Sequence, residues 1–88
     1  MEFEWDPAKA EANVRKHKID FNMAIKVFLD PWRIEDEQED DDDGMRFNVL
    51  GFVEGNMLYV TCTVRGHVYR IISARPAERH ERRRYHEG

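Results

Sequence analysis

The residues best suited to chemistry are four arginines in the C-terminal half, Arg46, Arg65, Arg70 and Arg75. All four lie in or at the end of strand-like runs, which can hold several side chains at fixed positions. A guanidinium group stays charged at any physiological pH and can bind two phosphate oxygens at once. The arginines therefore predict a phosphate-binding site, although each could instead form a surface ion pair.

Strand geometry divides these arginines between the two faces of a sheet. Arg70 and Arg75 are five residues apart, so in a regular strand they point to opposite sides unless a β-bulge lies between them. We expect Arg46, Arg65 and Arg75 to be catalytic residues that stabilise charge on a reacting phosphate. The further residues expected to bind the nucleic acid that carries this phosphate are Arg70, Arg82, Arg83 and Lys16.

One reaction that such a site could serve is the cleavage of RNA without a metal, which also needs a base for the ribose 2'-hydroxyl and an acid for the departing 5'-oxygen. The candidates are His17, His67, His80, Glu81 and Lys26. We favour His17 because histidine is the residue type that titrates closest to neutral pH. At the end of a predicted helix, however, His17 could instead bond to free helix carbonyls. Glu81 could be a base or an ion-pair partner within the arginine cluster.

Acidic and basic residues are unevenly distributed along the chain. Nine of the 18 acidic residues lie within residues 30–43, together with a single base, Arg33. The rest of the chain has a net charge of +4, against −4 for the whole, and residues 65–88 contain seven arginines. Such a basic surface is typical of a nucleic-acid binder, but equally of a protein with an acidic protein partner.

The acidic run 35–43 is predicted to be a solvated loop, because like charges at this density repel one another. Two alternatives are a phosphate mimic that covers the protein's own basic face and a cation site. We expect the activity to need neither a metal ion nor another cofactor.

The composition predicts one soluble domain, residues 1–88, because 88 residues are too few to divide between two hydrophobic cores. No apolar run approaches the roughly 20 residues that cross a bilayer, and the N-terminus lacks a secretory pattern. We therefore expect a cytoplasmic protein without membrane contact. The single cysteine, Cys62, shares a strand face with Leu58, Val60 and Val64, which predicts a buried thiol.

The chain begins with a strand-like alternation at Phe3 and Trp5, followed by two predicted helices. Asp6 and Pro7 mark the cap and the first residue of a helix that extends to about His17. A second helix is expected between Asp20 and Pro31. The residues on its apolar face are Phe21, Ala24, Ile25 and Phe28.

Beyond Pro31 the pattern becomes strand-like, first at Trp32 and Ile34 and then in three runs, 45–53, 57–65 and 68–75, that predict two successive hairpins. A final helix, residues 77–86, follows Pro76 and has almost no apolar side chains beyond Ala77 and Tyr85. The expected fold is α+β, an antiparallel sheet with two N-terminal helices and one C-terminal helix packed on it.

Two sets of motifs together carry a family resemblance. The first comprises residues 3–10, Asn13, Lys16-His17, and the run from Phe21 to Phe28 with Asp30-Pro31. The second comprises Arg46-Phe47, Gly51, Thr63-Val64-Arg65, the run from Tyr69 to Ala77, and Glu81 to Tyr85. In these motifs the chain resembles the BrnT family of bacterial type II toxin-antitoxin systems.

The resemblance implies the fold of the RelE and ParE toxin superfamily and a metal-independent endoribonuclease that inhibits translation and growth. It also implies neutralisation by a ribbon-helix-helix antitoxin of the BrnA type, with operator DNA contacted only through the toxin-antitoxin complex. Two alternatives are a toxin of the same fold that acts on a protein such as DNA gyrase, and a non-enzymatic binding module. Arginines spread over several strands favour the RNA-directed activity.

Two positions depart from the family pattern. Lys18 stands where the family usually has glycine after the Lys-His pair, so a lysine must make a turn that could need a positive φ. Met45 stands where a glutamate usually precedes the arginine matched by Arg46, a change that could remove an acid from the active face.

Overall fold

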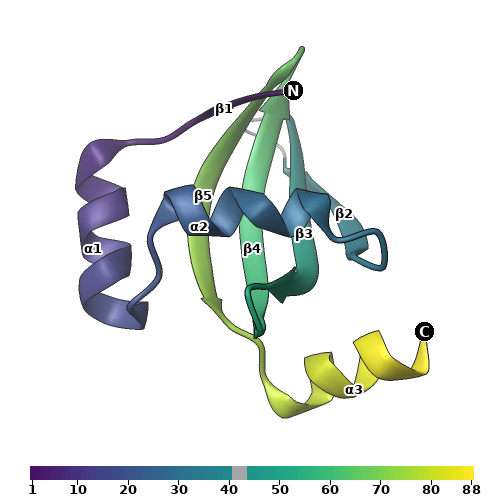
Figure 1. Cartoon of the computed structure of the whole chain (residues 1–88). Helices are drawn as coiled ribbons and strands as arrows, with labels where there is room; N and C mark the ends of the chain where they lie inside the picture. The colour runs from purple at the N-terminus through teal and green to yellow at the C-terminus, as the bar shows by residue number, and fades with distance from the viewer. Residues whose placement is uncertain (41–43) are drawn as a thin grey trace.

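Five strands form one sheet in the order β1-β5-β4-β3-β2, as the computed structural model shows (Figure 1). The structure describes residues 1–40 and 44–88. The strands are β1 (Glu2–Glu4), β2 (Ile34–Asp40), β3 (Gly44–Val53), β4 (Asn56–Arg65) and β5 (Val68–Pro76). β2 to β5 pair antiparallel, and the two predicted hairpins are confirmed. β1, however, pairs parallel with β5, so the sheet is mixed and the prediction of a purely antiparallel sheet was wrong.

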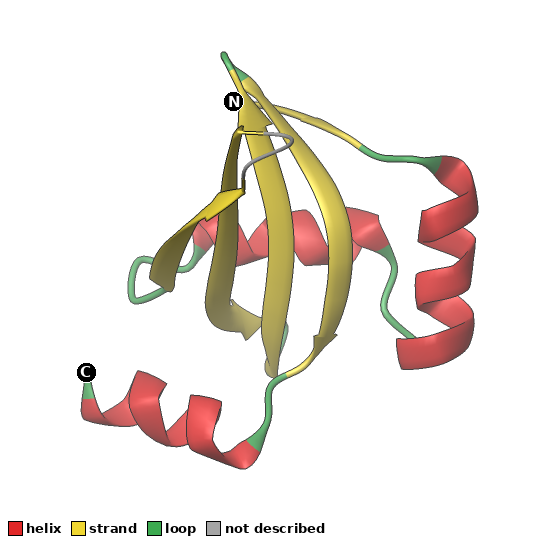
Figure 2. Cartoon of the chain, turned by 180° about the vertical axis from the view of Figure 1, so that it is seen from behind, coloured by secondary structure: helices red, strands yellow, loops and turns green. Residues whose placement is uncertain are grey.

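The helices lie on both sides of this sheet. α1 (Pro7–His17) has the predicted bounds, and the Asp6 side chain accepts a hydrogen bond from the Ala8 N–H at 2.8 Å. α2 (Phe21–Ala24) continues directly into the 3-10 helix η1 (Ile25–Leu29), and both contact the sheet on the same side as α1. α3 (Arg79–Glu87) lies across one end of the opposite face (Figure 2). The described helices include none long and apolar enough to span a membrane.

The second predicted helix is α-helical for only four residues and then tightens into η1. Its most buried residues are Phe21, Ala24, Val27 and Asp30, which recur every three positions, whereas Ile25 and Phe28 are half-buried. A repeat of three matches the three residues per turn of a 3-10 helix. The predicted spacing for one continuous α-helix was therefore right for Phe21 and Ala24, but beyond them it missed the change of helix type and the burial of Val27.

Two hydrophobic clusters hold the layers together. The larger lies between the sheet and α1, α2 and η1, and it includes Cys62, which is fully buried as predicted. β3 passes close to η1 at Gly51, where an added Cβ would stand 2.8 Å from Val27 Cγ2. The smaller cluster lies under α3, where Leu50, Met57 and Ala77 pack with Tyr85.

The acidic segment was predicted to be a loop, but its first part is strand β2, in register with β3 from Ile34↔Leu50 to Asp40↔Gly44. Nearby arginines offset the repulsion between its charges. Arg33 binds Glu35 at 2.9 Å, and Arg84 of α3 binds Asp36 through two hydrogen bonds of 2.6 and 2.8 Å. Residues 41–43, the rest of the predicted loop, lie outside the described residues.

Candidate active site

A β-bulge in β5 decides how its two arginines are oriented. Thr61 pairs with Ser73 and Cys62 pairs with Ile71, so the intervening Ile72 has no register partner in β4. The extra residue changes the alternation of side chains along β5. Arg70 and Arg75 therefore point to the same face of the sheet, which is the exception that strand spacing left open.

The other two strand arginines lie on that face as well. Arg46 and Arg70 both pair with Thr63, from the two neighbouring strands, and paired residues share a face. Arg65 is two residues beyond Thr63 in β4 and so points the same way. This face is opposite to α1 and α2, and α3 covers only one end of it (Figure 2).

Three of the four arginines meet in one pocket of about 290 Å³ at the end of the face away from α3. The residues that line it are Glu4, Lys9, Arg46, Thr63, Arg65, Val68, Arg70 and Ile72. Glu4 Oε2 lies 3.6 Å from Arg70 Nη1, and both side chains are about half exposed. The pocket thus offers a carboxylate beside several cations, a combination that can accept a proton and stabilise negative charge on a phosphate.

Glu4 and Lys9 were not among the residues predicted for the site. The alternation of Glu4 with Phe3 and Trp5 indicates that its side chain is on the polar face of a strand. What brings Glu4 to Arg70 is the parallel pairing of β1 with β5, two strands that are more than 60 residues apart in the sequence. No local signal in the sequence predicts this pairing.

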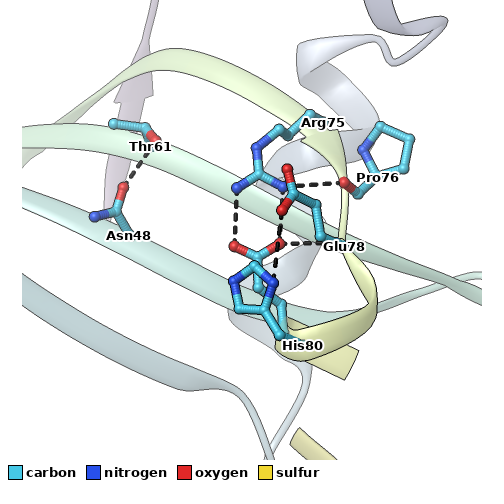
Figure 3. Close-up of polar contacts among 7 residues, drawn as sticks. Asn48, Thr61, Arg75, Pro76, Glu78 and His80 are labelled. Atoms are coloured by element: carbon cyan, nitrogen blue, oxygen red, sulfur yellow. Dashed lines mark hydrogen bonds and ion pairs between the residues drawn. The ribbon is translucent and has the colours of Figure 1, made fainter. Parts of the chain in front are cut away.

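Arg75 lies farther along the same face, where it binds Glu81 of α3. Figure 3 shows Arg75 beside Pro76 and Glu78 at the start of this helix. Its Nη1 and Nη2 donate to the two carboxylate oxygens of Glu81 at 2.8 Å each, and Nη1 also donates to the Pro76 carbonyl. Glu81 additionally accepts a hydrogen bond from the Glu78 N–H, which closes the capping box of α3. The Arg75 guanidinium stacks over the ring of Tyr59 at 4.4 Å.

This pairing fixes the charge states of both partners. The hydrogen bond from Arg75 is the largest influence on the pKa of Glu81 and, despite partial burial, lowers it below its usual value. The same bond raises the pKa of Arg75. Glu81 has the geometry of the ion-pair partner that was the alternative to a catalytic base, and it is 7% exposed.

The remaining predicted residues lie away from the arginine pocket. His17 is half-buried at the end of α1 and lines a separate groove together with Arg82. Lys16 is exposed on the last turn of α1, and Arg83 is exposed on α3. Most of the predicted site residues therefore lie in three places: the arginine pocket, the pair that Arg75 makes with α3, and the groove at the end of α1. Lys16 and Arg83 line none of these.

The two departures from the family pattern have different structural outcomes. Lys18 has a φ of 62°, and its N–H bonds to the Val14 carbonyl, so this lysine adopts the left-handed conformation suited to glycine. Met45 pairs with Val64 and thus points to the face opposite Arg46. An acidic residue at position 45 would not lie among the arginines. The methionine at this position therefore removes no acidic side chain from the face that carries them.

Within residues 1–40 and 44–88, no group of three or more His, Cys, Asp or Glu side chains is arranged to hold a metal ion. The arginine pocket instead has the donors of an anion site, namely guanidinium groups on neighbouring strands.

The fold and the candidate site together define a small α+β protein with a five-stranded mixed sheet and an arginine-lined pocket on the sheet face opposite α1 and α2. The family model described as "Ribonuclease toxin, BrnT, of type II toxin-antitoxin system" matches residues 5–81. The chain belongs to this family, and it is a ribonuclease toxin whose type II system implies an antitoxin partner.

A solved structure agrees with this assignment. The crystal structure of the Brucella abortus ribonuclease toxin BrnT is similar at 26% sequence identity with a TM-score of 0.68, and the match covers 90% of this chain and 99% of that one. The comparison with curated proteins found no match. The resemblance inferred from the sequence motifs is thereby confirmed at the level of the family.

Proposed function

We propose that the chain is a metal-independent endoribonuclease whose active site is the pocket lined by Arg46, Arg65, Arg70 and Glu4. The observation that supports this most directly is that these residues, from four different strands, line a single pocket. An anion site built on strands is rigid enough to be preorganised for charge that develops on a phosphate.

In this proposal Glu4 removes the proton from the ribose 2'-hydroxyl, whose oxygen then attacks the adjacent phosphorus. Arg46, Arg65 and Arg70 stabilise the negative charge that builds on the phosphoryl oxygens. The bond from phosphorus to the 5'-oxygen breaks, and Lys9 donates a proton to that oxygen. The products are a 2',3'-cyclic phosphate and a free 5'-hydroxyl.

Arg75 and Glu81 have a positioning role in this scheme. Because their charges are already satisfied by each other, neither is available to a substrate without breaking two hydrogen bonds. They attach α3 to the face that carries the pocket. His17 lies outside the pocket and is not required for the proton transfers proposed.

We further propose that the antitoxin is of the BrnA ribbon-helix-helix type and that operator DNA is bound only through the complex. The basis is the family relationship together with the concentration of arginines in residues 65–88, which an acidic or amphipathic antitoxin element would cover. The toxin and its RNA substrates would then meet in the cytoplasm.

The test is cleavage of a mixed-sequence RNA by purified, antitoxin-free protein in excess EDTA. We expect cleavage by the wild type and a loss of about 100-fold in rate for Arg46→Ala and Arg65→Ala, the usual effect of removing one donor that stabilises the transition state. Arg15→Ala serves as the matched control, because Arg15 is exposed on α1 and does not line the pocket.

Wild-type cleavage that stops in EDTA would contradict metal independence. Folded arginine variants that still cleave at the wild-type rate would instead show that the active site lies elsewhere on the protein. If intact RNA survives while the wild-type protein still arrests growth, the protein-directed alternative would replace the ribonuclease mechanism.

A further inference from the structure

A second groove, of about 650 Å³, lies at the end of the molecule where α1 stops, β3 turns into β4 and α3 begins. Its lining residues lie in or next to α1, α2, α3 and the ends of β3, β4 and β5, and none of them lines the arginine pocket. The groove is therefore a separate surface with its own composition.

The inside of this groove is mostly apolar. The side chains that form it are Ile19, Met23, Phe52, Met57, Leu58 and Ala77. Phe52 is 38% exposed, although it also packs against the Tyr85 ring at 5.4 Å. An exposed aromatic ring beside a hollow apolar surface is typical of a place where another apolar side chain docks.

The rim of the groove is basic. His17 and Lys18 border it from the end of α1, and Arg82 borders it from α3. The described lining includes no aspartate or glutamate, and none of these three bases forms an ion pair with a described residue. The groove thus combines an apolar interior with the positive charges of Lys18 and Arg82, for which the described residues provide no ion-pair partner.

We propose that this groove binds an acidic amphipathic segment of the antitoxin. Such a segment would place apolar side chains on Phe52 and Met57 and carboxylates near Lys18 and Arg82, so that both properties of the groove are used. RNA is a poorer match, because a ribose-phosphate chain makes little use of an apolar surface built mainly from aliphatic side chains. The inference rests on the antitoxin partnership of the proposed function.

The position of the groove has a consequence for neutralisation. The antitoxin is anchored where β3 turns into β4 and α3 begins, whereas the arginine pocket lies at the other end of these strands, around Arg46, Arg65 and Val68. Binding of the antitoxin in the groove can therefore be separated from obstruction of the arginine pocket. A groove variant loses affinity for the antitoxin, while its free form still cleaves RNA.

The test compares Lys18→Glu and Phe52→Ala, singly and combined, with the matched charge reversal Arg15→Glu on the exposed side of α1. The probe is the purified cognate antitoxin, and two quantities are measured: the Kd of the complex and the RNA cleavage rate of the free toxin. We expect the combined variant to raise the Kd at least about tenfold and to cleave RNA within about twofold of the wild type. Arg15→Glu should change neither quantity.

A circular dichroism melting curve establishes that each variant is folded, and Lys18→Glu alone, which removes no packing, covers the case in which Phe52→Ala unfolds. An unchanged Kd in the folded variants would overturn the proposal. So would a loss of RNA binding with an unchanged Kd for the antitoxin, which would identify the groove as a substrate site. The Kd does not depend on catalysis. A wild type that fails to cleave RNA would therefore refute the proposed function, while the binding test would still show whether the groove binds the antitoxin.

Discussion

The guanidinium group of Arg75 and the carboxylate of Glu81 face each other across two hydrogen bonds of 2.8 Å, which join the end of β5 to the first turn of α3. Glu81 also completes the capping box at the start of that helix. A single carboxylate therefore both caps α3 and attaches it to the sheet. The structure and stability of this end of the molecule depend on its charge.

Replacing Glu81 with glutamine should lower the free energy of unfolding by about 2 kcal/mol, because the partly buried Arg75 loses its ionic partner. Glu87→Gln is the matched control, since Glu87 is exposed near the other end of α3. Urea titration measures the difference. Equal unfolding midpoints for the two variants would contradict the role assigned to the pair.

The same pair predicts a pH dependence. The pKa of Glu81 is lowered in the folded protein, so as the pH falls the Glu81 carboxylate is protonated at a higher pH in the unfolded chain than in the folded one. The stabilisation is therefore complete above the ordinary carboxyl pKa of 4.5 and is lost as the pH falls through the folded pKa. The stability difference between the wild type and Glu81→Gln should shrink below pH 4.5, and a constant difference would argue against this linkage.

Glu4→Gln should lower the rate of RNA cleavage about 100-fold if Glu4 is the general base. The protein should remain folded, since Glu4 is about half exposed. Glu2→Gln controls for the loss of one negative charge on the same strand, because Glu2 does not line the pocket. The comparison is made with single-turnover rates on one RNA; a Glu4→Gln rate equal to that of Glu2→Gln would exclude Glu4 as the base.

Tyr85→Phe should destabilise the protein by about 1 kcal/mol, because the Tyr85 hydroxyl donates to the buried Asp30 at 2.7 Å. Burial, and then this hydrogen bond, raise the pKa of Tyr85 to about 12. The folded state keeps a proton that the unfolded state loses above pH 10, so stability falls as the pH rises from 10 towards 12. Thermal melts at neutral and alkaline pH should show this fall in the wild type and a smaller one in Tyr85→Phe.

Lys18→Gly should raise the stability by about 1 kcal/mol, because a non-glycine residue at φ 62° bears a steric cost that glycine avoids. Lys16→Gly is the opposing control: it lies within α1 and should lower stability by about the same amount. Urea unfolding curves of the two variants, each compared with the wild type, measure these changes. Destabilisation by both glycines would mean that the Lys18 side chain makes a stabilising contribution larger than its backbone cost.

Local patterns were sufficient for much of the fold. The cap at Asp6, the bounds of α1, the two hairpins and the buried Cys62 follow from short-range rules of capping, alternation and turn geometry, and the structure agrees with each. The motifs were also specific enough to identify the family. These features depend on neighbours within a few residues, so the sequence alone determines them.

The arrangement of the site depended on contacts between distant residues. The parallel pairing of β1 with β5 brings Glu4 to Arg70, and the bulge at Ile72 turns Arg70 to the same face as Arg75. Arg84 binds Asp36 and helps to make an acidic segment into a strand. Only the tertiary structure decided these points. Strand partners and ion pairs between distant segments are selected by the free energy of the whole packed sheet, whereas local propensity describes one segment at a time.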